Sequence, residues 1–263
     1  MEPQSTVPFV RVEIVEHIAR ITLDRVAKRN ALGLGVIRDL DRAFSGLPET
    51  VRVVVLDGAG EHFSAGLDLT EIPTLTPAET VMHSRAWYAA FDKIQFGRTP
   101  VVCVMQGAVV GGGLELASCA HVRVAEESAY FGLPEGRRGI FLGGGGSVRI
   151  PKLIGVSRVT EMMLTGRTYS AAEAFQIGLV HHVVPAGQGL ERAMALATQI
   201  AANAPLSNFA VMHGLPLIAE QPMTHGLMTE ALMTAITTSD PEARNRISDF
   251  LQKRAGKVTR EGL

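Results

Sequence analysis

Two short runs of apolar, largely β-branched residues at 51–56 and 101–105 constrain the fold more than any other feature of the sequence. Runs of this kind are typical of strands buried on both faces of a parallel sheet. Helical spacing of apolar residues precedes each run, over 32–47 and over 78–96. Alternation of buried strands with helices predicts an α/β domain.

The rest of the chain extends this plan. Residues 10–23 alternate apolar and polar side chains, which predicts a hairpin at one edge of the sheet. We expect short strands at 122–125 and 129–131, and a helix within 111–120. After about residue 185 only helical patterns occur, at 190–203, 206–220, 223–238 and 241–255. We therefore expect an α/β core over residues 1–200 and a helical C-terminal region over 201–263.

The charge balance, the longest uncharged stretch and the cysteine content limit the expected binding partners and the expected cellular compartment. Lys and Arg number 25 against 26 Asp and Glu, so the chain lacks the basic balance of a nucleic-acid-binding protein. The longest uncharged stretch, 99–114, is too short and too polar to span a bilayer. Two cysteines without CxxC spacing favour a reducing compartment. We expect a cytoplasmic protein with no nucleic-acid or membrane partner.

Several common catalytic signatures are missing from the sequence. It contains no Walker A motif, no GxGxxG, no GxSxG and no HExxH. His181 and His182 are adjacent on an expected strand and would point to opposite faces, which makes a poor metal chelate. We expect no metal site.

Glycine clusters and two glutamates are the candidate functional features. The chain has 27 glycines, gathered mainly around 66, 107–113 and 139–146. Tight turns between packed elements explain such clusters, and so does backbone held close to a ligand. Glu115 and Glu135 each lie beside a glycine-rich turn within an apolar segment. Each alone can be a hydrogen-bonded structural residue, whereas together they suggest an acid/base pair.

The helix expected after Gly111 adds a possible anion site. Glu115 would lie in its first turn, and the N–H groups of Gly112 and Gly113 would have no partner within the helix. A second loop, 61–68, follows the buried strand 51–56 and can supply another N–H group. Two such donors that converge on one carbonyl oxygen form an oxyanion hole.

Six segments in order give the chain a resemblance to the enoyl-CoA hydratase (crotonase) family. They are RNAL at 29–32, FSAGLD at 63–68, GAVVGGGLELA at 107–117, FGLPE at 131–135, LTGRTYSA at 164–171 with GLV at 178–180, and FxxK at 250–253. The resemblance implies an α/β fold built as a spiral of ββα units. It also implies a helical C-terminal region that builds homotrimers, often stacked as homohexamers.

The resemblance further implies an acyl-CoA thioester substrate, with coenzyme A as part of the substrate and no separate cofactor. The thioester carbonyl is expected between the backbone N–H groups of Ala65 and Gly112. Glu135 would donate a proton to C2, while Glu115 orients a water and takes up its proton. The residues expected to contact the substrate or its coenzyme A are Lys28, Ala65, Gly66, Leu67, Asp68, Gly112, Phe250 and Lys253.

The expected activity is the reversible hydration of 2-enoyl-CoA to 3-hydroxyacyl-CoA. A Δ3,Δ2-enoyl-CoA isomerase is the alternative within the family, although it needs only one of the two acids. A catalytically silent acyl-CoA-binding subunit is the alternative outside enzymes. The dienoyl-CoA isomerase branch carries an aspartate eight residues after the second acid, where this chain has Gly143.

Two departures from the family pattern lie after Glu135. Leu142 stands where the family commonly has a proline, within a run of glycines that can change the acyl pocket. Arg137 and Arg138 follow Glu135 closely, and a nearby cation lowers the pKa of a carboxyl group. Unless both guanidinium groups point away, they weaken the proton-donor role of Glu135.

Overall fold

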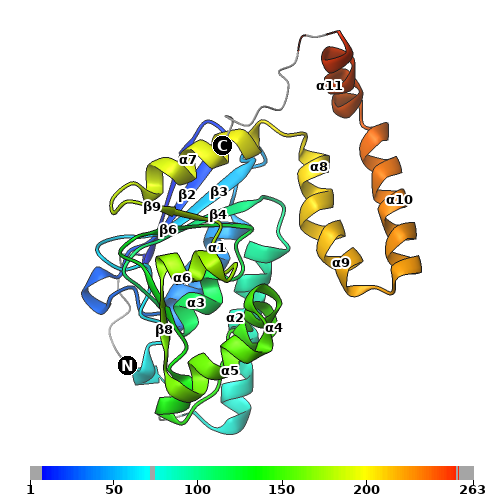
Figure 1. The fold of residues 1–263 in the computed structure, drawn as a ribbon. Helices are drawn as coiled ribbons and strands as arrows, with labels where there is room; N and C mark the ends of the chain where they lie inside the picture. The colour runs from blue at the N-terminus through cyan, green and yellow to red at the C-terminus, as the bar shows by residue number, and fades with distance from the viewer. Residues whose placement is uncertain (1–7, 72–74, 253, 255–263) are drawn as a thin grey trace. The chain divides into compact units, whose positions relative to one another are not determined.

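The computed structural model describes residues 8–71, 75–252 and 254. The chain forms two compact units, Met1–Ala201 and Ala202–Leu263. The first unit is an α/β unit with two sheets, and the described part of the second unit consists of helices joined by short turns (Figure 1).

A six-stranded sheet forms the frame of the first unit. Its spatial order is β1 (Val10–Val15), β2 (Ile18–Leu23), β3 (Val53–Gly58), β4 (Val101–Met105), β6 (Val122–Glu126) and β9 (His182–Val184). The β1–β2 hairpin is antiparallel and lies at the edge, and all other neighbours run parallel. The predicted hairpin and the two buried strands are confirmed.

A second, three-stranded sheet begins where β4 ends. It contains β5 (Ala108–Val110), β7 (Tyr130–Gly132) and β8 (Thr168–Ser170) in that order. Gly107, with φ of 53°, turns the chain from β4 into β5. A Cβ at Gly107 would lie 2.1 Å from the carbonyl oxygen of Glu61, so only glycine fits this turn.

Side-chain alternation along the central strands builds two apolar layers. Val53, Val55, Val102 and Val104 pack with the helix α7 (Gly189–Ala201) on one face. Their neighbours along the same strands join the larger core on the other face, with residues of α1 (Leu34–Ser45) and α2 (Pro77–Gln95). Strands buried on both faces explain why these runs read as continuously apolar.

Shorter helices complete the first unit. They are α3 (Gly112–Ala117), α4 (Gly146–Ile154), α5 (Val156–Thr165) and α6 (Ala171–Gln176), with single 3₁₀ turns at Val26–Lys28, Leu69–Glu71 and Glu135–Arg138. The helix expected within 111–120 is therefore present and shorter than predicted.

The second unit consists of α8 (Pro205–Phe209), a π-helical turn (Ala210–Gly214), α9 (Leu215–Glu220), α10 (Met223–Ser239) and α11 (Pro241–Leu251). The Asp240 side chain accepts a hydrogen bond from the Glu242 N–H and caps α11, with Pro241 as its first residue. None of the described helices in either unit is long and apolar enough to cross a membrane.

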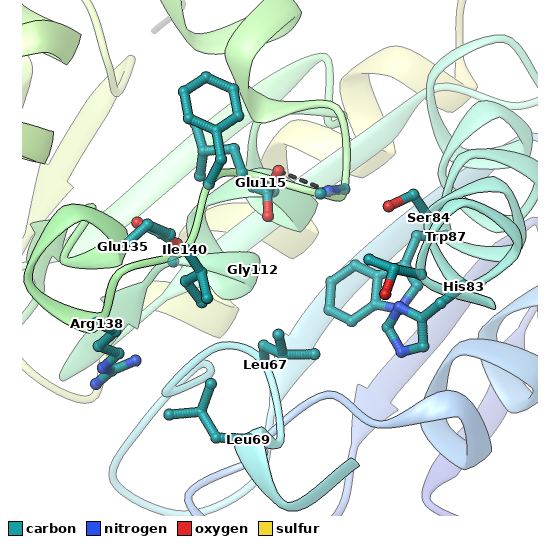
Figure 2. A pocket seen from close by; sticks show the side chains of 16 residues that line it. Leu67, Leu69, His83, Ser84, Trp87, Gly112, Glu115, Glu135, Arg138 and Ile140 are labelled. Atoms are coloured by element: carbon teal, nitrogen blue, oxygen red, sulfur yellow. Dashed lines mark hydrogen bonds between the residues drawn. The ribbon is translucent and has the colours of Figure 1, made fainter. Parts of the chain in front are cut away.

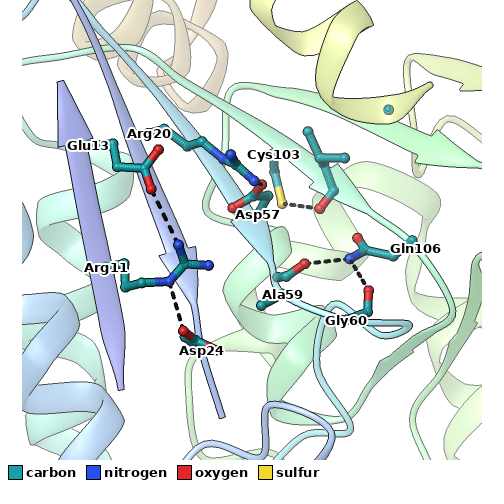
Figure 3. Close-up of polar contacts among 12 residues, drawn as sticks. Arg11, Glu13, Arg20, Asp24, Asp57, Ala59, Gly60, Cys103 and Gln106 are labelled. Atoms are coloured by element: carbon teal, nitrogen blue, oxygen red, sulfur yellow. Dashed lines mark hydrogen bonds and ion pairs between the residues drawn. The ribbon is translucent and has the colours of Figure 1, made fainter. Parts of the chain in front are cut away.

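Polar contacts tie the edge hairpin to the centre of the large sheet (Figure 3). Arg20 on β2 donates two hydrogen bonds to Asp57 Oδ2 on β3, at 2.9 and 2.7 Å. Gln106, just after β4, donates to the Gly58 carbonyl at 2.6 Å. These bonds fix the strand end from which the loop 59–68 departs.

Candidate active site

A cavity of about 320 Å³ is lined by segments that follow strands of both sheets and by one face of the helix α2 (Figure 2). The loop Leu67–Leu69 and the turn Gly111–Gly112 form part of its wall. One face of α2 contributes Thr80, His83, Ser84 and Trp87, and the segment 135–144 completes the lining. Apart from Glu115 and Glu135, the lining holds no carboxylate.

Two backbone N–H groups converge at one end of this cavity. The nitrogen of Leu67 lies 3.3 Å from where a Cβ on Gly112 would stand, and the nitrogen of Gly112 lies 3.2 Å from a Cβ placed on Gly66. Neither N–H donates a hydrogen bond to another described residue. Because Gly112 begins α3, its N–H has no partner within the helix. An oxygen in the cavity can accept from both.

Ala65 does not supply the donor that the resemblance implied. Its N–H donates to the Arg29 carbonyl at 2.9 Å, so the chain itself already uses this hydrogen. The prediction of Ala65 as an oxyanion donor is therefore wrong for this structure. The free N–H lies two residues later, on Leu67, which the sequence indicated only as a contact residue.

Asn30 and Ser64 hold this loop in shape. Asn30 is buried with φ of 54°, and its side-chain amide donates to the carbonyls of Ala59 and His62 at 2.9 and 2.8 Å. Ser64 Oγ donates to the Asn30 carbonyl and accepts from the Gly66 N–H. The segment RNAL therefore acts by fixing the loop that presents the Leu67 N–H.

Glu115 is buried in the first turn of α3, and one of its oxygens is fixed by the glycine run. Oε1 accepts hydrogen bonds from the N–H groups of Gly144 and Gly146, both at 2.8 Å. Burial raises the pKa of Glu115, and these two N–H groups oppose that shift. A Cβ on Gly146 would lie 2.6 Å from Glu115 Cγ, so this approach requires glycine. Sequence analysis noted the glycine run without predicting this contact.

Arg149 braces the turn that holds Glu115. Its guanidinium donates to the Gly144 carbonyl at 3.0 Å, to Asp92 Oδ1 at 2.9 Å and to Gln95 on α2. Both backbone polar groups of Gly144 are therefore held, the carbonyl oxygen by Arg149 and the N–H by Glu115.

Glu135 lies in a less polar environment. Its side chain is buried, and Oε2 accepts no hydrogen bond from any described residue. Burial raises the pKa of Glu135 to about 7, and the neighbouring charge of Glu115 acts in the same direction. Glu135 therefore keeps its proton to a higher pH than an exposed glutamate does.

The two arginines after Glu135 take different directions. Arg137 points away and donates to the Thr165 carbonyl. Arg138 lines the cavity and lowers the pKa of Glu135, but burial outweighs this effect. Arg138 therefore acts in the direction that the sequence predicted and Arg137 points away, while the net shift of the Glu135 pKa is upward.

The remaining predicted contact residues are placed as follows. Asp68 is buried and forms ion pairs with Arg25 at 2.7 Å and Lys28 at 3.1 Å, while its Oδ1 accepts from Thr70. Although burial alone would raise it, these hydrogen bonds hold the pKa of Asp68 well below its usual range. Phe250 is exposed on α11 in the second unit. Lys253 lies outside the described residues.

Comparisons with known proteins agree on one family. The family model described as enoyl-CoA hydratase/isomerase matches residues 13–260. A solved structure from Rhodopseudomonas palustris CGA009, provisionally named an enoyl-CoA hydratase, has a TM-score of 0.91 and 49% identity over 95% of this chain and 97% of that one.

Curated relatives point the same way. Enoyl-CoA hydratase EchA19 of Mycobacterium tuberculosis is 31% identical to this chain, over 94% of this chain's length and 95% of its own length. The 2,3-dehydroadipyl-CoA hydratase of Escherichia coli K12 is 33% identical over 91% of this chain and 94% of its own. The crotonase-type α/β fold is thus confirmed, and the chain belongs to the enoyl-CoA hydratase/isomerase (crotonase) family of enzymes.

Proposed function

We propose that this protein catalyses the reversible hydration of 2-enoyl-CoA thioesters to 3-hydroxyacyl-CoA. One observation carries the proposal: two buried carboxyl groups in unlike surroundings line the same cavity as two free, converging N–H groups. Carboxyl groups whose environments differ in this way are suited to opposite proton-transfer roles.

The thioester oxygen accepts hydrogen bonds from the N–H groups of Leu67 and Gly112. These bonds withdraw electrons from the conjugated double bond and stabilise the enolate that forms when C3 is attacked. The thioester therefore activates its own double bond, and the chemistry requires no metal or redox cofactor. Coenzyme A enters and leaves as part of the substrate.

The two glutamates divide the proton transfers. Glu115 accepts two N–H hydrogen bonds at Oε1, and these favour its ionised form. It takes a proton from a water molecule while the oxygen of that water bonds to C3. Glu135, with no such bond at Oε2, holds its proton and donates it to C2. Each turnover leaves Glu115 protonated and Glu135 ionised, and proton exchange with solvent restores the starting state.

Residues outside the cavity complete the proposal. Lys28, Gly66 and Asp68 stand beside the Leu67 loop and are proposed to contact coenzyme A, with Phe250 and Lys253 acting from the C-terminal region. Exposed apolar side chains along α10 support self-association of the chain, as a homotrimer or homohexamer; they are Leu227, Met228, Leu232 and Ile236.

The direct test follows the absorbance of the conjugated thioester of crotonyl-CoA, which hydration removes. We expect rapid loss of this absorbance with formation of 3-hydroxybutyryl-CoA. If 3-enoyl-CoA is instead converted to 2-enoyl-CoA and no 3-hydroxyacyl-CoA forms, the protein is an isomerase. Tight acyl-CoA binding without turnover at any chain length would indicate a silent binder.

The pH dependence of kcat/KM is expected to be the same in both directions. Hydration starts with the proton on Glu135 and dehydration with the proton on Glu115, so both need the pair to carry one proton. The pair loses this proton near the raised pKa of Glu135, about 7. Rate profiles between pH 5 and 9 should therefore fall above about pH 7 for crotonyl-CoA and for 3-hydroxybutyryl-CoA alike. A profile that stays level to pH 9 contradicts the assigned proton donor.

Arg149→Met is expected to lower kcat by about 10- to 100-fold, because a loosened Gly144 turn no longer fixes Glu115. Arg158→Met is the matched control, since Arg158 bonds only the Ile154 carbonyl of the preceding helix among its described partners. Both variants would be compared by kcat and by thermal unfolding. A folded Arg149→Met enzyme with unchanged kcat would exclude the bracing role.

A further inference from the structure

Among the described residues that line the cavity, Arg138 is the one arginine or lysine, and its side chain is exposed. It ends the 3₁₀ turn that begins with Glu135, and no ion pair or hydrogen bond engages its guanidinium within the described chain. Figure 2 shows it on the same side of the cavity as Glu135, across from His83, Ser84 and Trp87.

The neighbouring arginine makes the contrast clear. Arg137 bonds the Thr165 carbonyl and packs over Gly166, away from the cavity. The two adjacent arginines of one 3₁₀ turn thus have different surroundings, and of the two only Arg138 lines the cavity.

Within the described residues Arg138 forms no ion pair, although its charge acts on the Glu135 carboxyl. Glu135 lies near it but forms no ion pair with it, and burial keeps the Glu135 carboxyl partly protonated. Other lining residues on the two flanking segments are apolar, including Leu69, Ile140 and Phe141. Arg138 is exposed, and arginine keeps its charge at any physiological pH, so its guanidinium can bind an anionic group that a ligand brings into the cavity.

We propose that Arg138 binds a carboxylate at the far end of the acyl group, so that the enzyme prefers 2-enoyl-CoA thioesters of dicarboxylic acids to those of plain fatty acids. The proposal rests on the hydration activity proposed above. A planar guanidinium binds a carboxylate through two parallel hydrogen bonds, which adds direction as well as attraction. The coenzyme A phosphates are the other anionic groups that a substrate brings, and the experiment separates the two.

The test compares kcat/KM for crotonyl-CoA with that for 2-enedioyl-CoA thioesters of five to seven carbons. Wild type is expected to favour the dicarboxylic series. In Arg138→Leu this preference should fall by about 10- to 100-fold, the range for a lost charge-assisted hydrogen bond. Arg138→Lys should keep part of it, and Arg137→Leu, the matched control, should keep all of it.

Three outcomes would overturn the proposal. The first is wild type showing no preference for the dicarboxylic series. The second is Arg138→Leu losing equal activity on both substrate classes. The third is a loss seen with coenzyme A thioesters but absent with N-acetylcysteamine thioesters, which lack the phosphates; this would assign Arg138 to the coenzyme instead.

A binding measurement keeps the inference separate from the catalytic proposal. Calorimetry with glutaryl-CoA and butyryl-CoA, which cannot be hydrated, measures the same preference without turnover. If wild type hydrates nothing yet binds glutaryl-CoA at least tenfold more tightly, and Arg138→Leu removes that difference, hydration fails while the carboxylate site stands. Equal binding of the two thioesters by wild type rejects the carboxylate site whatever the enzyme catalyses.

Discussion

Glu135→Gln and Glu115→Gln are each expected to lower kcat for crotonyl-CoA hydration by about 10²- to 10⁴-fold, the range for loss of a general acid or base. Glutamine keeps the shape of each side chain. At position 115 its amide oxygen can still accept the N–H groups of Gly144 and Gly146, so the glycine turn should survive. What each variant loses is the exchangeable proton at the cavity.

The measurement is the initial rate of absorbance loss for wild type and both variants, with Glu127→Gln as control. Glu127 is exposed and lies outside the cavity, so its variant should match wild type. Full hydration by either Glu115→Gln or Glu135→Gln would refute the two-carboxylate mechanism. If wild type forms no 3-hydroxyacyl-CoA and Glu115→Gln keeps the 3-enoyl to 2-enoyl conversion, the protein is an isomerase that uses Glu135 alone.

Removal of the Leu67 N–H is expected to cost about 10²- to 10³-fold in kcat, the effect of losing one oxyanion-hole donor. The clean change is an amide-to-ester substitution, with the α-hydroxy analogue of leucine at position 67. Proline at Gly112 is a poorer probe because a Cβ there would lie 2.9 Å from ring carbons of Trp87. The ester removes the hydrogen-bond donor and adds no bulk.

The matched control is the same ester substitution at Ala65. Each ester weakens one carbonyl that accepts a backbone hydrogen bond, Gly66 from Leu32 and Ser64 from Val110. Only the Leu67 ester also removes an N–H that faces the cavity. The Ala65 ester should therefore lower stability without a comparable loss of kcat. The reverse result would restore Ala65 as the donor and refute the assignment to Leu67.

The frame of the fold was predictable because burial leaves a clear trace in sequence. Residues 53–56 of β3 and 101–105 of β4 lie between two apolar layers, so each of them is apolar. The hairpin at the edge alternates in sequence, although in the structure β1 is exposed after Val10 and only β2 is largely buried. The strands expected at 122–125 and 129–131 are present as β6 and β7. The other two strands of the small sheet, β5 and β8, are three residues long each, too short for a periodicity to be read.

Two helix starts could have been read from sequence and were missed in detail. Thr76 and Ser170 each form a capping box with a glutamate three residues later, Glu79 and Glu173. This S/T-x-x-E pattern is a local signal that stands in the printed sequence. It would have located the start of α6, a helix for which residue periodicity gave no prediction.

The identity of the carboxyl groups followed from the sequence, whereas the identity of the backbone donors did not. An isolated glutamate in an apolar segment is visible as a costly residue. Which N–H in the loop 61–68 stays free depends on which carbonyls reach the others, and the Arg29 carbonyl comes from a segment more than thirty residues away. Such long-range hydrogen bonds leave no local pattern in the sequence. For this reason the predicted donor was Ala65, whereas the free N–H in the structure belongs to Leu67.

The raised pKa of Glu135 also has a thermodynamic cost for the folded chain. An unfolded glutamate releases its proton near pH 4.5, but the folded protein retains this one to about pH 7. Between these values the native state binds more protons than the unfolded state, so the free energy of unfolding declines as pH rises through this window. The decline amounts to at most about 3 kcal/mol and is complete above pH 7. Folding in this range is thus accompanied by proton uptake, and the residue that carries the reaction's proton makes the native state less stable under the conditions in which it works.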